Sequence, residues 1–83
     1  MPGDATAWVT YSVWMERLRG ADGAEDIIMR GFREGHKELS KTARALLTQR
    51  LALLALHSGN QKRARAYAKE TQRRGLTPQN EVR

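Results

Sequence analysis

The chain has 83 residues, no cysteine and a formal net charge of +6 at pH 7. This length fits a single domain, and the lack of cysteine excludes disulfides, thiolate metal sites and cysteine nucleophiles. Because the first residues lack the layout of a signal peptide and no apolar run reaches the roughly 18 residues that span a bilayer, we expect a cytoplasmic protein without a membrane span.

Four glycines divide the chain into segments with helical periodicity: Gly20, Gly35, Gly59 and Gly75. Each follows a helix-compatible run with basic residues or histidine near its end, where a left-handed residue commonly stops a helix. The pattern predicts an all-α fold of four helices, arranged as two antiparallel hairpins or a small bundle, in one domain over residues 1–76. Residues 77–83 are polar, and we expect them to form a disordered tail.

The first predicted helix covers about residues 5–19, with Asp4 or Thr6 as its N-cap. Helical spacing favours core packing for its apolar residues, and any exposed aromatic among them is a candidate anchor for a protein partner. These residues form one stripe: Trp8, Tyr11, Trp14, Met15 and Leu18.

The second predicted helix covers about residues 23–34, after a loop at residues 20–23, and Asp22 is its expected N-cap. Gly31 lies inside this helix at a cost of about 1 kcal/mol relative to alanine, which indicates that another helix passes close by. The apolar stripe consists of Ile27, Ile28, Gly31 and Phe32, and Phe32 joins the candidate partner contacts.

The third and fourth predicted helices cover about residues 40–58 and 61–74, with Ser40 and Asn60 as expected N-caps. The third helix is apolar almost all round its C-terminal half, which predicts a central position in the fold. Its main stripe is Ala43, Leu46, Leu47, Leu51 and Leu54.

Basic residues concentrate in the second half of the chain. Residues 1–38 carry five basic and seven acidic side chains, whereas residues 39–83 carry ten and two. This asymmetry favours an acidic partner, either nucleic acid or an acidic protein surface, and a merely solubilising face is the alternative. The candidate contacts are the basic residues of the fourth helix: Lys62, Arg63, Arg65, Lys69, Arg73 and Arg74.

The spacing Trp8-x-x-Tyr11-x-x-Trp14, followed by Glu16, Gly20 and the run 24–30, resembles a half-a-tetratricopeptide repeat. The segment 59–67 is similar to an ordinary tetratricopeptide hairpin. Ala24 and Ala64 lie 40 residues apart, however, whereas such repeats have a period of about 34 residues. The resemblance implies a binding scaffold within a multiprotein assembly, and for the half-repeat branch an assembly that processes RNA.

No set of residues predicts catalysis, a metal site or a cofactor. His36 and His57 lie 21 residues apart without a metal-ligand spacing, and the acidic residues 22–26 suit helix capping better than cation binding. We therefore expect a non-enzymatic protein–protein interaction module, such as an adaptor, regulator or assembly subunit, with a protein partner or a second copy and no small-molecule substrate. The alternative is a nucleic-acid-binding regulator that uses the fourth helix.

Overall fold

The computed structural model describes residues 3–73 and contains three helices in this range, α1 (Ala5–Glu34), α2 (Lys41–His57) and α3 (Gln61–Arg73). No residue in the described range belongs to a strand, so the all-helical character is confirmed there. The prediction of four helices in two hairpins is wrong.

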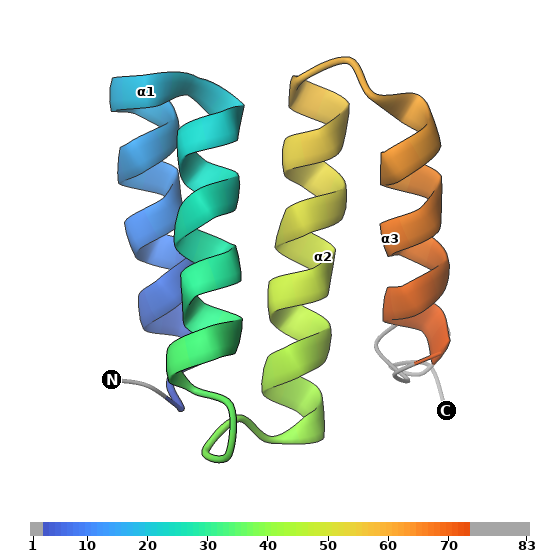
Figure 1. Cartoon of the computed structure of the whole chain (residues 1–83). Coiled ribbons are helices and arrows are strands. Elements are labelled where there is room, and N and C mark those ends of the chain that lie inside the picture. Colours follow the sequence, from blue (N-terminus) through green and yellow to red (C-terminus); the bar gives the residue numbers. More distant parts are fainter. Residues whose placement is uncertain (1–2, 74–83) are drawn as a thin grey trace.

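The difference lies at residues 20–23, which were expected to form a loop and instead belong to α1. Only Gly20 leaves helical geometry, with φ 80° and ψ −176°, a region almost confined to glycine. One residue therefore suffices to reverse the chain, and α1 has two antiparallel arms, residues 5–19 (arm 1) and residues 21–34 (arm 2) (Figure 1). Asp22, the expected N-cap, lies inside α1 beyond the bend.

Three of the predicted N-caps are confirmed. The side chains of Asp4, Ser40 and Asn60 each accept a hydrogen bond from the backbone N–H three residues further on, at 3.1, 3.0 and 3.1 Å. These bonds satisfy donors that have no partner inside the helix.

The predicted helix stops are only partly confirmed. Gly59 has a φ of 83°, as expected. Gly35 has a φ of −91°, and no left-handed residue is needed there because the backbone N–H of Leu39 donates to its carbonyl in one further turn. Arg74, the predicted stop at Gly75 and the predicted tail at residues 77–83 lie outside the described residues.

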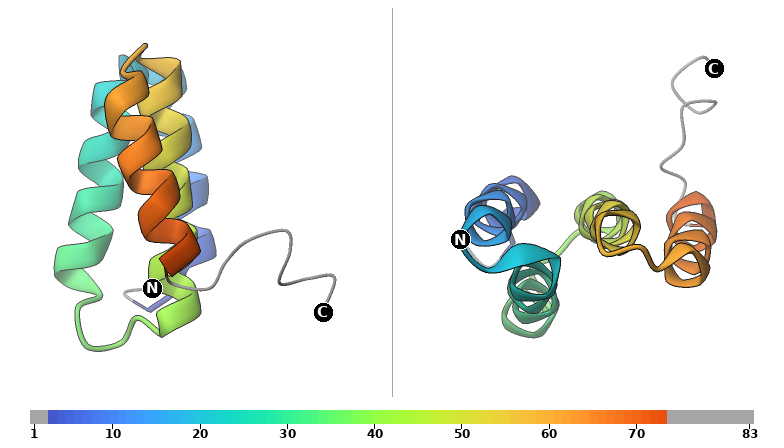
Figure 2. Two further views of the ribbon diagram at one scale, coloured as in Figure 1. Left: turned by 90° about the vertical axis from the view of Figure 1, so that its right-hand side faces the viewer. Right: turned by 90° about the horizontal axis from the view of Figure 1, so that it is seen from above.

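α2 lies between α1 and α3 (Figure 2), which confirms the central position predicted for this segment. The arms of α1 pack against one side of α2, and α3 packs against another. The resulting core is built mainly from residues of α1 and α2: Trp8, Ala24, Ile28, Leu47, Leu51 and Leu54.

The two arms of α1 approach each other closely at Gly31. A β-carbon placed on Gly31 would lie 2.9 Å from both Cγ and Cδ2 of Trp8, and the Trp8 side chain is only 2% exposed. The prediction of a close approach at Gly31 is confirmed, and the approaching group is the indole ring of arm 1.

Candidate functional site

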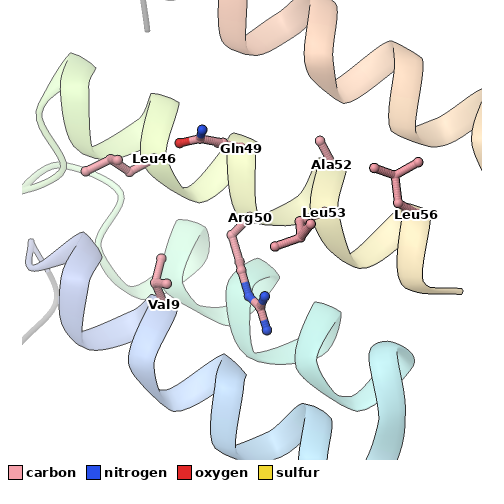
Figure 3. Close-up of a pocket in the computed structure, with 7 residues that line it drawn as sticks. All are labelled: Val9, Leu46, Gln49, Arg50, Ala52, Leu53 and Leu56. Carbon is pink, nitrogen blue, oxygen red and sulfur yellow. The ribbon is translucent and has the colours of Figure 1, made fainter. Parts of the chain in front are cut away.

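An apolar groove of about 450 Å³ lies between arm 1 and α2. Val9 comes from arm 1, and the remaining lining residues come from α2 (Figure 3): Leu46, Gln49, Arg50, Ala52, Leu53 and Leu56. Leu53 is 43% exposed and Leu56 is 56% exposed. The groove therefore presents leucine side chains to solvent in a hollowed part of the surface.

The exposed face of α2 has a regular spacing. Leu46, Gln49, Leu53 and Leu56 follow one another at intervals of three, four and three residues, which is the spacing of the seam along which two helices pack. The opposite face of α2 carries the buried Leu47, Leu51 and Leu54. α2 thus has two apolar faces, and only one of them packs in the core.

A second, smaller hollow of about 290 Å³ lies between α2 and α3. Leu56 lines it as well as the groove, so the two hollows meet at this side chain. The other lining residues belong to α3: Gln61, Ala64, Arg65 and Ala68. Arg65 therefore brings a positive charge to the edge of the apolar surface.

A polar cluster lies beneath the groove and joins arm 1 to α2. Arg50 is 8% exposed, and its Nε donates to Oγ of Ser12 at 2.8 Å while its second terminal nitrogen donates to Oε1 of Glu16 at 2.8 Å. Nδ1 of His57 lies 2.5 Å from the other carboxylate oxygen of Glu16. Ser12, itself fully buried, donates to the carbonyl of Val9 at 2.7 Å.

The partners of Glu16 keep it ionised. Partial burial alone would raise the pKa of its carboxyl, but the hydrogen bonds with His57 and Arg50, together with their charges, outweigh that effect and lower the pKa below its ordinary value. Each carboxylate oxygen has one partner, and the carboxylate in turn compensates the buried charge of Arg50. The arrangement holds two helices together across the floor of the groove.

The basic residues predicted on the fourth helix do not share one environment. Lys62, Arg65 and Lys69 are exposed and form no ion pair within residues 3–73. Arg63 instead donates to the Tyr67 hydroxyl at 3.1 Å and pairs with Glu25 of arm 2 at 2.8 Å, and these contacts raise the pKa of its guanidinium above the ordinary value. Arg73 pairs with Glu70.

The predicted aromatic contacts are also divided. Trp8 belongs to the core, where only 2% of it is exposed, and Phe32 packs half-buried against that core. Trp8 therefore offers almost no surface to a partner, whereas Phe32 keeps part of its surface exposed and stays a predicted contact. The exposed part of the apolar stripe of arm 1 is called the aromatic stripe and consists of Tyr11, Trp14 and Leu18, which are 39%, 60% and 76% exposed. The guanidinium of Arg17 lies 5.8 Å from the Trp14 ring centroid.

Sequence reasoning missed the polar cluster and the groove. One usable signal was Arg50, a charged residue in the middle of the apolar α2 segment. Another was the pair Ser12 and Glu16, four residues apart on the same side of arm 1. The spacing of Leu46, Leu53 and Leu56 was a further signal, because it is the spacing of a second helix-packing face, although the prediction placed Leu46 in the main stripe.

Comparison of the chain with protein-family models, curated proteins and solved structures gave no match. The resemblance to half-a-tetratricopeptide repeats therefore stays a prediction. Within residues 3–73, no group of three histidine, aspartate or glutamate side chains is placed to hold a metal ion. None of the helices in that range has the length and apolar character of a membrane span.

Proposed function

We propose that this chain is a non-enzymatic protein-binding module whose groove between arm 1 and α2 receives a segment of a protein partner. The observation that carries the proposal is the hollowed row of leucines on α2, opposite the face that packs in the core. An adaptor, a regulator and an assembly subunit all fit this role. A cytoplasmic location stays a prediction.

The exposed leucines make such binding favourable. Fully burying a leucine contributes about 1.5–3 kcal/mol, so covering side chains that are half exposed, as Leu53 and Leu56 are, contributes about 1 kcal/mol each. Val9 and Leu46, which are partly buried, extend the same surface. Side chains that fill a desolvated hollow commonly dominate the energy of protein association.

The aromatic stripe is the competing apolar surface. It lines neither of the two hollows, and Arg17 already lies against the ring of Trp14. The groove offers a partner contacts from two helices at once, whereas the stripe offers one helix face. We therefore assign the partner to the groove and use the stripe as the control surface.

The test is a comparison of two variants with the same chemical change, Leu53→Asp in the groove and Leu18→Asp in the stripe. Each is used to capture proteins from extracts of the source cells beside the unaltered chain, after circular dichroism has shown that both variants fold. Leu53→Asp should lose the proteins that the unaltered chain retains, and Leu18→Asp should keep them. The reverse pattern, or full retention by Leu53→Asp, would refute the groove as the binding site.

A nucleic-acid-binding regulator is the second candidate, and Lys62, Arg65 and Lys69 favour it because all three are exposed without an ion pair in the described range. If they bind phosphates, the affinity for DNA or RNA should fall steeply as the salt concentration rises. The affinity should also be lower in the double variant Arg65→Glu plus Lys69→Glu than in the unaltered chain. Binding that the double substitution leaves unchanged would reject this site.

A further inference from the structure

The spacing of the α2 side chains along the groove suits packing against a second helix. The interval pattern of Leu46, Gln49, Leu53 and Leu56 presents side chains once or twice per turn along a single line of α2, which is the surface that a second helix meets in knobs-into-holes packing. The walls are helices, whose backbone donors and acceptors are used within the helices themselves. An extended segment would find no sheet edge to join in the described range.

The length of the row sets the length of the occupant. Leu46 and Leu56 are ten residues apart, and at about 1.5 Å per residue the row extends about 15 Å, close to three helical turns. A partner helix of about 12–14 residues would cover it and reach the second hollow beside α3.

The charge around the groove selects an acidic helix. Together α2 and α3 contain eight lysine and arginine residues and one acidic residue, Glu70. Arg50, Arg63 and Arg73 are compensated by carboxylates. Arg65 lines the second hollow and has no carboxylate partner in the described range, and neither has Lys69 one helical turn further on.

The same charges disfavour a second copy of the chain as the occupant. α2 contains no aspartate or glutamate, so in a symmetric contact between two α2 faces neither α2 would supply a carboxylate to the cations of the other copy. Symmetric pairing would also leave Arg65 and Lys69 without acidic partners from the α2 of the other copy.

We infer that the groove binds an acidic amphipathic helix of a protein partner, about three turns long, with leucine-like residues against Leu53 and Leu56 and carboxylates beside Arg65 and Lys69. This inference rests on the proposed protein-binding function and specifies its ligand. The apolar row supplies affinity, and the unpaired cations supply selection by charge.

The experiment uses two synthetic peptides of about 14 residues, each held helical by a side-chain crosslink. Both carry leucines at the a and d positions of a heptad, and their flanking positions are all glutamate in one and all lysine in the other. Each is titrated into the full-length chain, and backbone amide shifts are followed by NMR. The glutamate peptide should shift residues 46–57 and 61–69 and should bind at least about tenfold more tightly than the lysine peptide.

The charge contacts are tested separately. The double variant Arg65→Glu plus Lys69→Glu should bind the glutamate peptide about tenfold more weakly than the unaltered chain does. Raising the salt concentration to about 1 M should weaken binding to the unaltered chain to a similar extent. Arg33→Glu, Lys37→Glu is the matched control, because it changes the net charge equally at residues that line neither hollow. This control should bind the peptide within about twofold of the unaltered chain.

Several results would overturn the inference. Equal affinity for both peptides would remove the selection by charge, and shifts confined to arm 1 would move the site to the aromatic stripe. Failure of both peptides would reject a helical occupant, and a dimer abolished by Leu53→Asp would identify the occupant as a second copy. The proposed protein-binding function is decided independently by capture with Leu53→Asp and Leu18→Asp.

Discussion

Replacing Gly31 by alanine places a methyl group against the ring of Trp8, at a close contact between the two arms of α1. The new carbon would lie 2.9 Å from Cγ and Cδ2 and 3.3 Å from Cδ1 of the indole. Contacts below 3.0 Å force a shift, and the affected atoms belong to the base of a buried ring rather than to the end of a flexible side chain. The arms must therefore separate or the ring must move.

Two effects of opposite sign decide the result. Alanine is favoured over glycine inside a helix by about 1 kcal/mol, whereas forcing an additional methyl group into a packed core costs about 1–3 kcal/mol. Because the ring is enclosed on all sides, we expect the packing cost to exceed the helix gain. The net loss of about 1 kcal/mol corresponds to a fall in Tm of about 4–8 °C in a domain of this size.

A double-mutant cycle with Trp8→Met isolates the contact. Methionine is flexible and lets the new methyl group fit, so Gly31→Ala should be stabilising by up to about 1 kcal/mol in that background. Urea unfolding followed by circular dichroism gives all four free energies of unfolding. Stabilisation by Gly31→Ala in the unaltered chain, or the same effect in both backgrounds, would refute the assignment of Trp8 as the reason for the glycine.

Three further predictions concern the polar cluster and the bend of α1. Arg50→Met should lower the free energy of unfolding by about 3 kcal/mol, because it leaves the Glu16 carboxylate without its guanidinium partner. Adding Glu16→Gln removes that carboxylate and should restore part of the loss. Equal losses in the single and the double variant, measured by urea unfolding, would contradict this. The pKa of Glu16 is lowered in the folded chain, so its contribution to stability is complete above its ordinary pKa of 4.5 and is lost as the pH falls through the lower folded value. Urea midpoints should therefore fall less with acid in Glu16→Gln than in the unaltered chain, and parallel curves would contradict this. Gly20→Ala should cost about 1–3 kcal/mol from backbone strain alone, since no atom lies within 4 Å of the added carbon, and a thermal melt without change would refute it.

Local rules predicted the helical segments and their N-caps well. Asp4, Ser40 and Asn60 bind the backbone donors that their positions predicted, because capping depends on residues only two or three positions away. The chain reversal at Gly20 and the close approach at Gly31 were also predictable. Glycine adopts backbone conformations that stop a helix, and inside a helix it is less stable than alanine, so its presence indicates a turn or a close contact.

The features that the sequence did not reveal depend on contacts between distant segments. Ser12 and Arg50 are 38 residues apart in sequence, and Glu16 and His57 are 41, so no local pattern shows that they meet. The apolar periodicity of α2 likewise predicts two apolar faces without showing which one is covered. Asp22 failed as an N-cap because a bend of one glycine left the helical hydrogen-bond pattern in place on both sides.

The polar cluster and the groove are linked through Arg50. Its side chain crosses from α2 to arm 1 at a distance fixed by hydrogen bonds to Ser12 and Glu16, and the same side chain lines the groove. A leucine row along a heptad seam commonly draws two neighbouring helices into direct contact. Here the guanidinium occupies part of that space, and its charge is compensated by Glu16 rather than by a ligand. The cluster therefore holds arm 1 in place while keeping the groove floor neutral, so the proposed selection of an acidic partner depends on Arg65 and Lys69 of α3.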